Sequence, residues 1–261
     1  MTQRPVLIMI HGGGHSHPKY FETLQSLLQA EGFSTVTGTN PSDGAINFTP
    51  GRSFYDDATY WREKILSIID NDQDVVVFMH SVASLVGIEA AKGLTKTDRA
   101  KSGKKGGVAH LIFLAGYLPN EGDTVFDFYN GPRGNCPTRA VFTQLNGTDV
   151  LDIRPYHDNY YSDMDKVERD YWKQYISYQT LDFFTLPITH ATWKDVPCSW
   201  IYTELDDIIP VDIQKQFILE AKRDSDIHIR TFSLPSGHSP FLNMPDKVVE
   251  IIQTVYDENQ L

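Results

Sequence analysis

A serine stands where an apolar strand meets a helix. Residues 74–79 read DVVVFM, a continuous apolar run typical of a strand buried in a parallel sheet, and Ser81 follows just before a segment of helical composition. This junction predicts a nucleophile elbow, which exposes a serine hydroxyl at the carboxyl edge of the sheet, near the positive end of a helix. Met79 and Ala83 replace the usual glycines of the motif, so a helix-capping role stays open on this segment alone. Ser84 lies inside the helix and is the poorer candidate.

A glycine-rich turn follows the first apolar run of the chain. Residues 11–18 read HGGGHSHP and come directly after PVLIMI. Backbone N–H groups in such a turn can point at a negatively charged oxygen that develops during a reaction. We expect Gly13 to supply one donor and Val82 the other, because both turns lie at the same edge of the sheet as the serine. Gly12 and His80 flank the donors and are expected to contact the substrate. The alternative is a simple tight turn.

Two later loops carry an acid and a histidine. The segment YTELDDIIP, residues 202–210, ends an expected strand and continues with acidic residues. Asp206 and Asp207 are both able to orient a histidine, whereas Glu204 is less well placed. The alternative is that these acids cap the next helix. His238 lies in LPSGHSPFL, between the last expected strand and the last expected helix.

The order of these residues along the chain favours a joint interpretation. A lone histidine in a loop is usually structural, and a lone serine before a helix is often a cap. Ser81, Asp206 and His238, however, occur in the order nucleophile, acid, base, each after the end of an expected strand. We therefore predict that Ser81 is the nucleophile, His238 the general base, and Asp206 the acid that orients the histidine.

Strand-like and helix-like segments alternate along most of the chain. This alternation predicts an α/β fold with a mostly parallel central sheet of about six strands and helices on both faces. Strands are expected at 5–10, 34–36, 74–79, 110–115, 199–202 and 228–232, and helices at 20–30, 53–69, 82–94, 211–222 and 246–256.

The alternation stops between residues 119 and 195. This segment has no clear buried strand and is rich in aromatic residues, which predicts a helical cap inserted after the fourth strand. The predicted core is then 1–118 together with 196–261. Most of the cap aromatics are expected to pack the cap onto the core, and a minority to line a pocket. The candidates for that lining are Phe126, Phe128, Tyr156, Trp172 and Phe184.

Composition excludes several classes of function. The net charge of −11 argues against nucleic acid or an anionic membrane as partner. The basic run at 101–105 lacks interleaved aromatic residues and is interpreted as a solvated loop. No run approaches the roughly 18 apolar residues of a transmembrane helix, and no signal peptide is evident. With only two cysteines, we expect a cytoplasmic protein. A zinc site is disfavoured, because no acidic or cysteine partners cluster with the three histidines of the glycine-rich turn, His11, His15 and His17.

These motifs together resemble the α/β-hydrolase fold, and within it the compact branch of plant methyl esterases and hydroxynitrile lyases with related fungal hydrolases. The likeness covers nearly the whole chain. Members of that branch share an H-G-[AG] loop, an H-S elbow, a T-E-x-D-x-x-x-P acid loop and a G-[HD]-[HS] loop. The matching segments are 11–13, 80–81, 203–210 and 237–239. The third of these favours Asp206 over Asp207.

Two departures from the branch bear on the reaction. Val82-Ala83-Ser84 replaces the glycines that often follow the elbow serine, which could reshape the pocket floor. The lyases carry a lysine soon after the base histidine, whereas Ser239-Pro240-Phe241 stands here. Cyanohydrin cleavage is therefore disfavoured.

The resemblance and the order of the motifs imply a serine hydrolase that cleaves a small, fairly apolar ester or lactone through an acyl-enzyme, without cofactor or metal. The same residues could instead serve C–C bond cleavage, decarboxylation or cyclisation of a biosynthetic intermediate. A small-molecule receptor without catalysis is a further alternative. The expected partner is a small-molecule substrate, and the oligomeric state stays open, a homodimer included.

Overall fold

The central feature of the computed structural model is a six-stranded sheet in which every pair of neighbouring strands is parallel. The structure describes residues 4–43, 52–130, 141–145 and 147–261. The strand order is β2-β1-β3-β4-β8-β9. The strands are β1 (Val6–Ile10), β2 (Thr35–Val36), β3 (Val75–His80), β4 (Val108–Leu114), β8 (Cys198–Thr203) and β9 (Ile229–Leu234). The predicted mostly parallel sheet of about six strands is confirmed.

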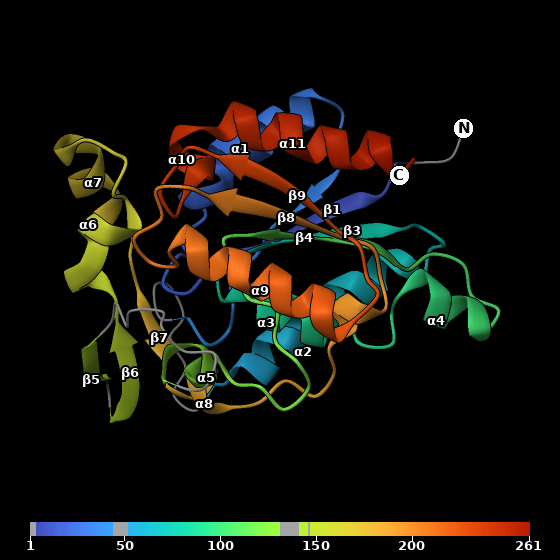
Figure 1. Cartoon of the computed structure of the whole chain (residues 1–261), viewed down its shortest axis with the longest axis horizontal. Helices are drawn as coiled ribbons and strands as arrows, with labels where there is room; N and C mark the ends of the chain where they lie inside the picture. Colours follow the sequence, from blue (N-terminus) through green and yellow to red (C-terminus); the bar gives the residue numbers. More distant parts are fainter. Residues whose placement is uncertain (1–3, 44–51, 131–140, 146) are drawn as a thin grey trace.

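Helices cover both faces of this sheet (Figure 1). One face carries α1 (Lys19–Ala30), α10 (Pro240–Asn243) and α11 (Pro245–Glu258), and the other carries α2 (Phe54–Ile69), α3 (Ala83–Ala91) and α9 (Val211–Asp224). Successive side chains of a strand point to opposite faces. Within β3, accordingly, Val76 and Phe78 pack with the first set of helices, and Val77 and Met79 with the second. Burial on both faces explains why the central strands are continuous apolar runs.

The sheet edge at the carboxyl ends of the strands is fixed by close packing of α3 on β3. A Cβ atom built at Gly87 of α3 would lie 2.2 Å from the sulfur of Met79. Only glycine lets the helix approach the strand this closely. The contact holds the middle of α3 against the end of β3, close to the turn that carries Ser81.

The segment between β4 and β8 contains both helices and strands. Figure 1 shows much of it at the end of the molecule toward which β8 and β9 point. Its elements are α5 (Val125–Asn130), β5 (Val141–Leu145), β6 (Thr148–Asp152), η1 (Arg154–Tyr156), α6 (His157–Tyr160), α7 (Lys166–Lys173), β7 (Tyr178–Thr180), α8 (Asp182–Thr185) and η2 (Thr192–Lys194). The helices were expected, but the antiparallel sheet β5-β6-β7 was not. Its strands are short and carry polar residues, so no buried apolar run marks them in the sequence.

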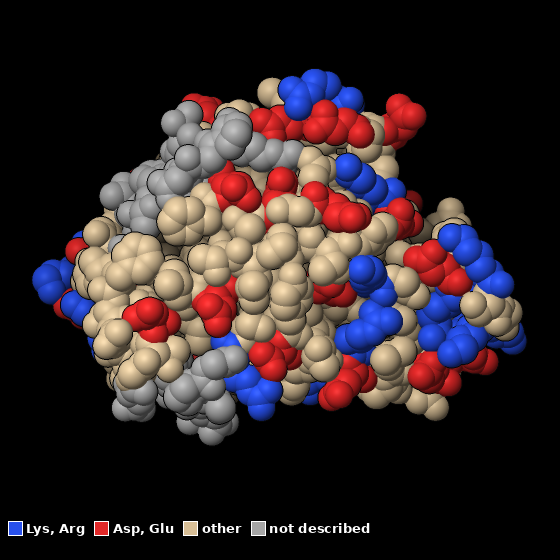
Figure 2. All heavy atoms as spheres, turned by 90° about the horizontal axis from the view of Figure 1, so that it is seen from below, with Lys and Arg blue, Asp and Glu red and all other residues tan. Residues whose placement is uncertain are grey.

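The surface agrees with the interpretation of the basic run as a solvated loop. In Figure 2, Lys and Arg side chains gather at the end of the molecule that carries α4 (Lys96–Lys101), with acidic side chains beside them. Lys96 pairs with Asp74 at 2.6 Å, and Lys101 pairs with Asp98 at 2.9 Å. In the described part of the chain, no helix is long and apolar enough to cross a membrane.

Candidate active site

Ser81 occupies a strained turn between β3 and α3. Its φ angle is +56°, in the left-handed region that residues other than glycine rarely adopt. The Ser81 N–H donates to the carbonyl of Leu114 on β4 at 3.0 Å, which anchors the turn to the neighbouring strand. A backbone held in this region costs free energy and recurs at functional sites. The expected strand–turn–helix junction is therefore present, with Ser81 at its apex.

Ser84 stabilises this turn through two hydrogen bonds. Its hydroxyl donates to the Ser81 carbonyl at 2.7 Å and accepts from the Tyr117 N–H at 3.1 Å. The side chain is fully buried, and a Cβ atom at Gly116 would lie 2.2 Å from its oxygen. Ser84 thus ties the elbow to the segment after β4, and its hydroxyl is fully engaged in that role.

The structure brings His238 and Asp206 together. Nδ1 of His238 lies 2.8 Å from Oδ2 of Asp206, and both side chains are fully buried. The carboxylate also accepts from the Thr203 hydroxyl at 2.7 Å and from the N–H groups of Ile208 and Ile209 at 2.8 and 2.9 Å. These bonds fix its orientation. Because Nδ1 donates to Asp206, Nε2 of His238 is the acceptor nitrogen, and it is buried without a partner among the described residues.

The other two acids of this loop point elsewhere. Asp207 is exposed, and Glu204 is an exposed residue whose carboxylate accepts from the Ser233 hydroxyl at 2.5 Å. Asp206 is the one that contacts the histidine.

His80 joins the elbow to the loop that carries His238. Its Nε2 donates to the His238 carbonyl at 2.9 Å, and the two rings lie 4.7 Å apart. Burial lowers the pKa of His80 well below the ordinary value, with His238 adding to the effect, so the ring stays neutral. The sequence suggested a substrate contact for His80 but gave no signal for this link.

Hydrogen bonds orient the peptide between Gly12 and Gly13. The Gly12 carbonyl accepts from Nδ1 of His11 at 2.8 Å and from the His15 N–H at 3.2 Å. Nε2 of His11 accepts from the Asn40 N–H at 3.0 Å, which places the ring proton on Nδ1. In a trans peptide the N–H points away from the carbonyl. The Gly13 N–H is therefore turned away from His11, and its role as an oxyanion donor stays a prediction.

The glycine loop lies against the elbow. A Cβ atom at Gly12 would lie 3.1 Å from Cβ of Ser81, and one at Gly13 would lie 3.2 Å from Cγ2 of Val82. The predicted donors Gly13 and Val82 are thus neighbours, although they lie far apart in the sequence.

Hydrogen bonds hold both the carbonyl and the N–H of the peptide between Gly13 and Gly14. Nδ1 of His15 donates to the Gly13 carbonyl at 2.8 Å, and the Gly14 N–H donates to Asp43 at 3.0 Å. Nε2 of His15 then accepts from the Tyr161 hydroxyl at 3.2 Å. Burial lowers the pKa of His15 to about 3. His15, like His11, uses both ring nitrogens to fix the loop, which leaves neither free to bind zinc.

Four consecutive residues of the segment between β4 and β8 contact the loops of the site. Tyr161 bonds to His15, as above, and the Tyr160 ring lies 5.6 Å from the His238 ring. The Ser162 hydroxyl donates to the Leu205 carbonyl at 3.1 Å. The Asp163 carboxylate accepts from the Gly237 N–H at 2.6 Å and from the Asn243 amide at 2.7 Å. These residues are not among the predicted site residues, since no periodic pattern in the sequence marks them.

The aromatic residues predicted to line a pocket occupy different environments. Phe128 and Phe184 belong to the hydrophobic core under α2 and α9. The Trp172 ring stacks on Tyr20 of α1 with centroids 5.5 Å apart. Tyr156 is half-buried and Phe126 is 40% exposed. These positions agree with packing roles for the first three, whereas contact with substrate stays a prediction for all five.

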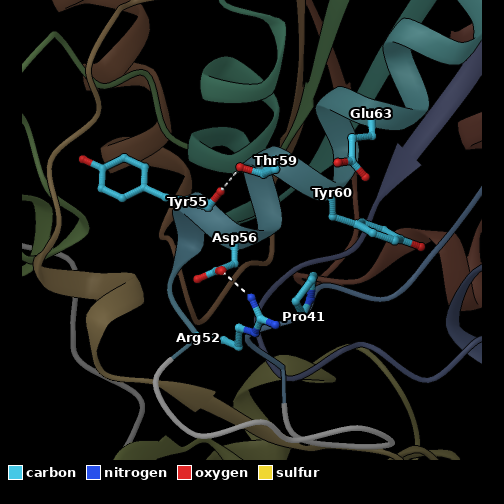
Figure 3. Close-up of a pocket in the computed structure, with 7 residues that line it drawn as sticks. All are labelled: Pro41, Arg52, Tyr55, Asp56, Thr59, Tyr60 and Glu63. Atoms are coloured by element: carbon cyan, nitrogen blue, oxygen red, sulfur yellow. Dashed lines mark hydrogen bonds and ion pairs between the residues drawn. The ribbon is translucent and has the colours of Figure 1, made fainter.

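A pocket on the outer surface lies away from these residues. Figure 3 shows it along the first turns of α2, where the guanidinium of Arg52 pairs with Asp56 at 2.6 Å. None of the predicted site residues lines it.

Comparisons with known proteins agree with the fold. The sequence matches the alpha/beta hydrolase family over residues 7–251. The alpha/beta hydrolase nvfD of Aspergillus novofumigatus is 25% identical over 255 residues, 98% of each chain. The crystal structure of polyneuridine aldehyde esterase has a TM-score of 0.73 at 17% identity, over 97% of this chain and 99% of that one. The methylesterase MES16 from Arabidopsis has a TM-score of 0.71 at 16% identity, with the same coverage.

These matches confirm the expected resemblance to plant methylesterases and fungal hydrolases. The chain belongs to the alpha/beta hydrolase family.

Proposed function

We propose that this hydrolase cleaves a small, fairly apolar ester or lactone through an acyl-enzyme on Ser81. The observation that carries the proposal is the pairing of His238 with Asp206, which leaves a buried Nε2 without a partner in the described part of the chain, near the strained elbow. The esterases among the structural neighbours support the same class of reaction.

The proposed reaction begins with attack of the Ser81 hydroxyl on the substrate carbonyl, while Nε2 of His238 takes the hydroxyl proton. Asp206 holds the ring in the required tautomer. The N–H groups of Gly13 and Val82 stabilise the tetrahedral oxyanion, a contribution worth about 10²–10³ in rate for each donor. His238 then protonates the departing alcohol, and a water molecule releases the acid from Ser81 by the same steps.

The second candidate function uses the same residues but breaks or forms a different bond of the substrate. Val82-Ala83-Ser84 stands where glycines often follow the elbow serine, and the Val82 side chain is buried against Gly13, beside the proposed donors. This restricts the space around the carbonyl and favours the alternative of C–C cleavage, decarboxylation or cyclisation over broad ester hydrolysis. Rapid turnover of simple aryl esters would argue against it.

Burst kinetics with p-nitrophenyl butyrate test the proposal. An acyl-enzyme predicts a burst of nitrophenol close to one equivalent of enzyme when deacylation is slow, or steady turnover when it is fast. Both signals should disappear in Ser81→Ala and persist in the control Ser67→Ala, which changes an exposed hydroxyl on α2. Equal activity in Ser81→Ala and the wild type would refute the mechanism.

A further inference from the structure

A buried glutamine from the segment between β4 and β8 lies beside the proposed oxyanion donors. Gln179 is in the middle of β7, is 1% exposed, and forms a backbone bridge with Asp43. A Cβ atom built at Gly13 would lie 3.4 Å from the Gln179 Oε1 atom and 3.2 Å from Cγ2 of Val82. The carbonyl end of this amide therefore lies beside Gly13, next to Val82, and these two residues are the proposed oxyanion donors.

A chain of hydrogen bonds fixes which end of the amide faces the site. The Asp57 carboxylate accepts from the Ser42 N–H at 2.7 Å and from the Ser42 hydroxyl at 2.5 Å. A hydroxyl has one proton, so the Ser42 oxygen can then only accept. It accepts from Nε2 of Gln179 at 2.8 Å. The amide nitrogen is thus directed to Ser42, and the amide oxygen is directed away from it, toward Gly13.

The Gln179 oxygen is an acceptor that lacks a donor. It is buried and has no hydrogen-bond partner within the described residues. Buried polar groups are almost always paired, because an unpaired one loses its hydration without compensation. Each of the other polar atoms in this series of hydrogen bonds has a partner. The one atom of the series without a partner among the described residues is the Gln179 oxygen, which lies beside the glycine loop.

We propose that Oε1 of Gln179 accepts a hydrogen bond from a hydroxyl or amide N–H of the substrate, two or three bonds from the scissile carbonyl carbon. This inference rests on the proposed function and narrows its substrate class to esters or lactones that carry such a donor. A site with a fixed acceptor discriminates against analogues that lack the donor, because their binding leaves the acceptor unpaired.

Matched esters test this preference. The values of kcat/KM for p-nitrophenyl 3-hydroxybutyrate and p-nitrophenyl butyrate are compared at pH 8.5, each divided by its rate of hydroxide-catalysed hydrolysis. We expect the wild type to prefer the hydroxylated ester at least tenfold. Gln179→Met keeps the length of the side chain and removes the acceptor, so the ratio should fall to about one. The control Gln174→Met, at an exposed glutamine whose amide donates to the Tyr171 carbonyl, should keep the wild-type ratio.

A second variant tests the donor-to-acceptor direction of these hydrogen bonds without changing Gln179. In Asp57→Asn the new amide can donate to the Ser42 oxygen, so the Ser42 hydroxyl turns and donates to Gln179. The Gln179 amide then reverses and presents N–H groups to the site. We expect the preference for the hydroxylated ester to be lost in this variant, although the glutamine is retained. A preference kept in both Gln179→Met and Asp57→Asn would overturn the proposal.

A binding measurement separates this proposal from the proposed reaction. Benzyl 3-hydroxybutyrate and benzyl butyrate are titrated into Ser81→Ala, which needs no turnover. Tighter binding of the hydroxylated ester, abolished by adding Gln179→Met, supports the acceptor even if the wild type hydrolyses neither ester, an outcome that would refute only the hydrolase mechanism. Equal binding of both esters, together with equal kcat/KM in the wild type, would show that Gln179 does not recognise the hydroxyl and would overturn the proposal.

Discussion

His11 is predicted to act on the reaction through the peptide that it orients. Its Nδ1 donates to the Gly12 carbonyl at 2.8 Å, while Nε2 accepts from the Asn40 N–H at 3.0 Å. Removing the ring in His11→Ala frees the Gly12–Gly13 peptide to rotate, so the Gly13 N–H no longer stays directed at the oxyanion. The same change leaves the buried Asn40 N–H without its acceptor.

The expected magnitudes follow from these two losses. Removal of an oxyanion donor costs about 10²–10³ in kcat. The His15 N–H still holds the Gly12 carbonyl at 3.2 Å, so we expect a partial effect of about 10- to 100-fold in kcat, with little change in KM. The unsatisfied Asn40 N–H should lower the free energy of unfolding by about 1–3 kcal/mol.

A conservative variant separates the effect on the orientation of the Gly12–Gly13 peptide from the effect on the stability of the fold. The amide nitrogen of His11→Asn can take the place of Nδ1 and donate to the Gly12 carbonyl. Its oxygen then lies at the position of the histidine Cδ2 atom and does not reach the place of Nε2, so the Asn40 N–H still lacks its acceptor. We expect His11→Asn to recover most of the kcat lost in His11→Ala while remaining similarly destabilised. The assay is steady-state hydrolysis of p-nitrophenyl butyrate alongside chemical denaturation, with His228→Asn as the control at an exposed histidine. Equal kcat in the two His11 variants, or a loss confined to KM, would refute this reasoning.

Four further changes have defined outcomes. Asp206→Asn should lower kcat by about 10⁴, because the ring loses the partner that sets its tautomer; unchanged kcat would exclude that role. Asp163→Ala should lower kcat and cost about 1–3 kcal/mol, measured by denaturation, since the Gly237 N–H loses its acceptor. Burial raises the pKa of Asp57 to about 7, so its stabilising contribution is complete below about pH 4 and is lost as the pH rises through 7. Asp57→Asn should remove this decline from a plot of unfolding free energy against pH. Phe128→Ala should cost about 3–5 kcal/mol, because the ring is fully buried, and a smaller loss would place it outside the packed core.

The sheet and the elbow could be predicted from local patterns. A strand buried on both faces must be apolar throughout, so residues 74–79 identify β3, and the position of Ser81 after it follows from parallel topology. The order of Ser81, Asp206 and His238 along the chain then indicated which loops meet at one edge. The division of the chain at 118 and 195 stays a prediction.

The hydrogen-bond network around these residues could not be predicted, because it depends on contacts between distant segments. Asp163 contacts Gly237, 74 residues away, and Gln179 contacts Ser42, 137 residues away. Neither pair has a spacing that a local pattern could reveal. The antiparallel sheet of the inserted segment was missed for a similar reason: Val141 and Phe142 of β5 are exposed. This strand is therefore specified by pairing with β6 and not by burial of one face.

Cys198, the cysteine in the described part of the chain, is not suited to act as a nucleophile. Cys198 is buried in β8, where burial raises the pKa of its thiol. A raised pKa disfavours the reactive thiolate. Cys136 lies outside the described residues.

The most direct test of the central claim is labelling with a fluorophosphonate probe, followed by intact mass and peptide mapping. Activated serines react with such probes, and the reaction requires the base as well as the hydroxyl. We expect one adduct, located on Ser81, formed rapidly in the wild type and in Ser67→Ala, absent in Ser81→Ala and greatly slowed in His238→Ala. A folded wild-type protein that forms no adduct, or one that forms it equally in Ser81→Ala, would contradict the account.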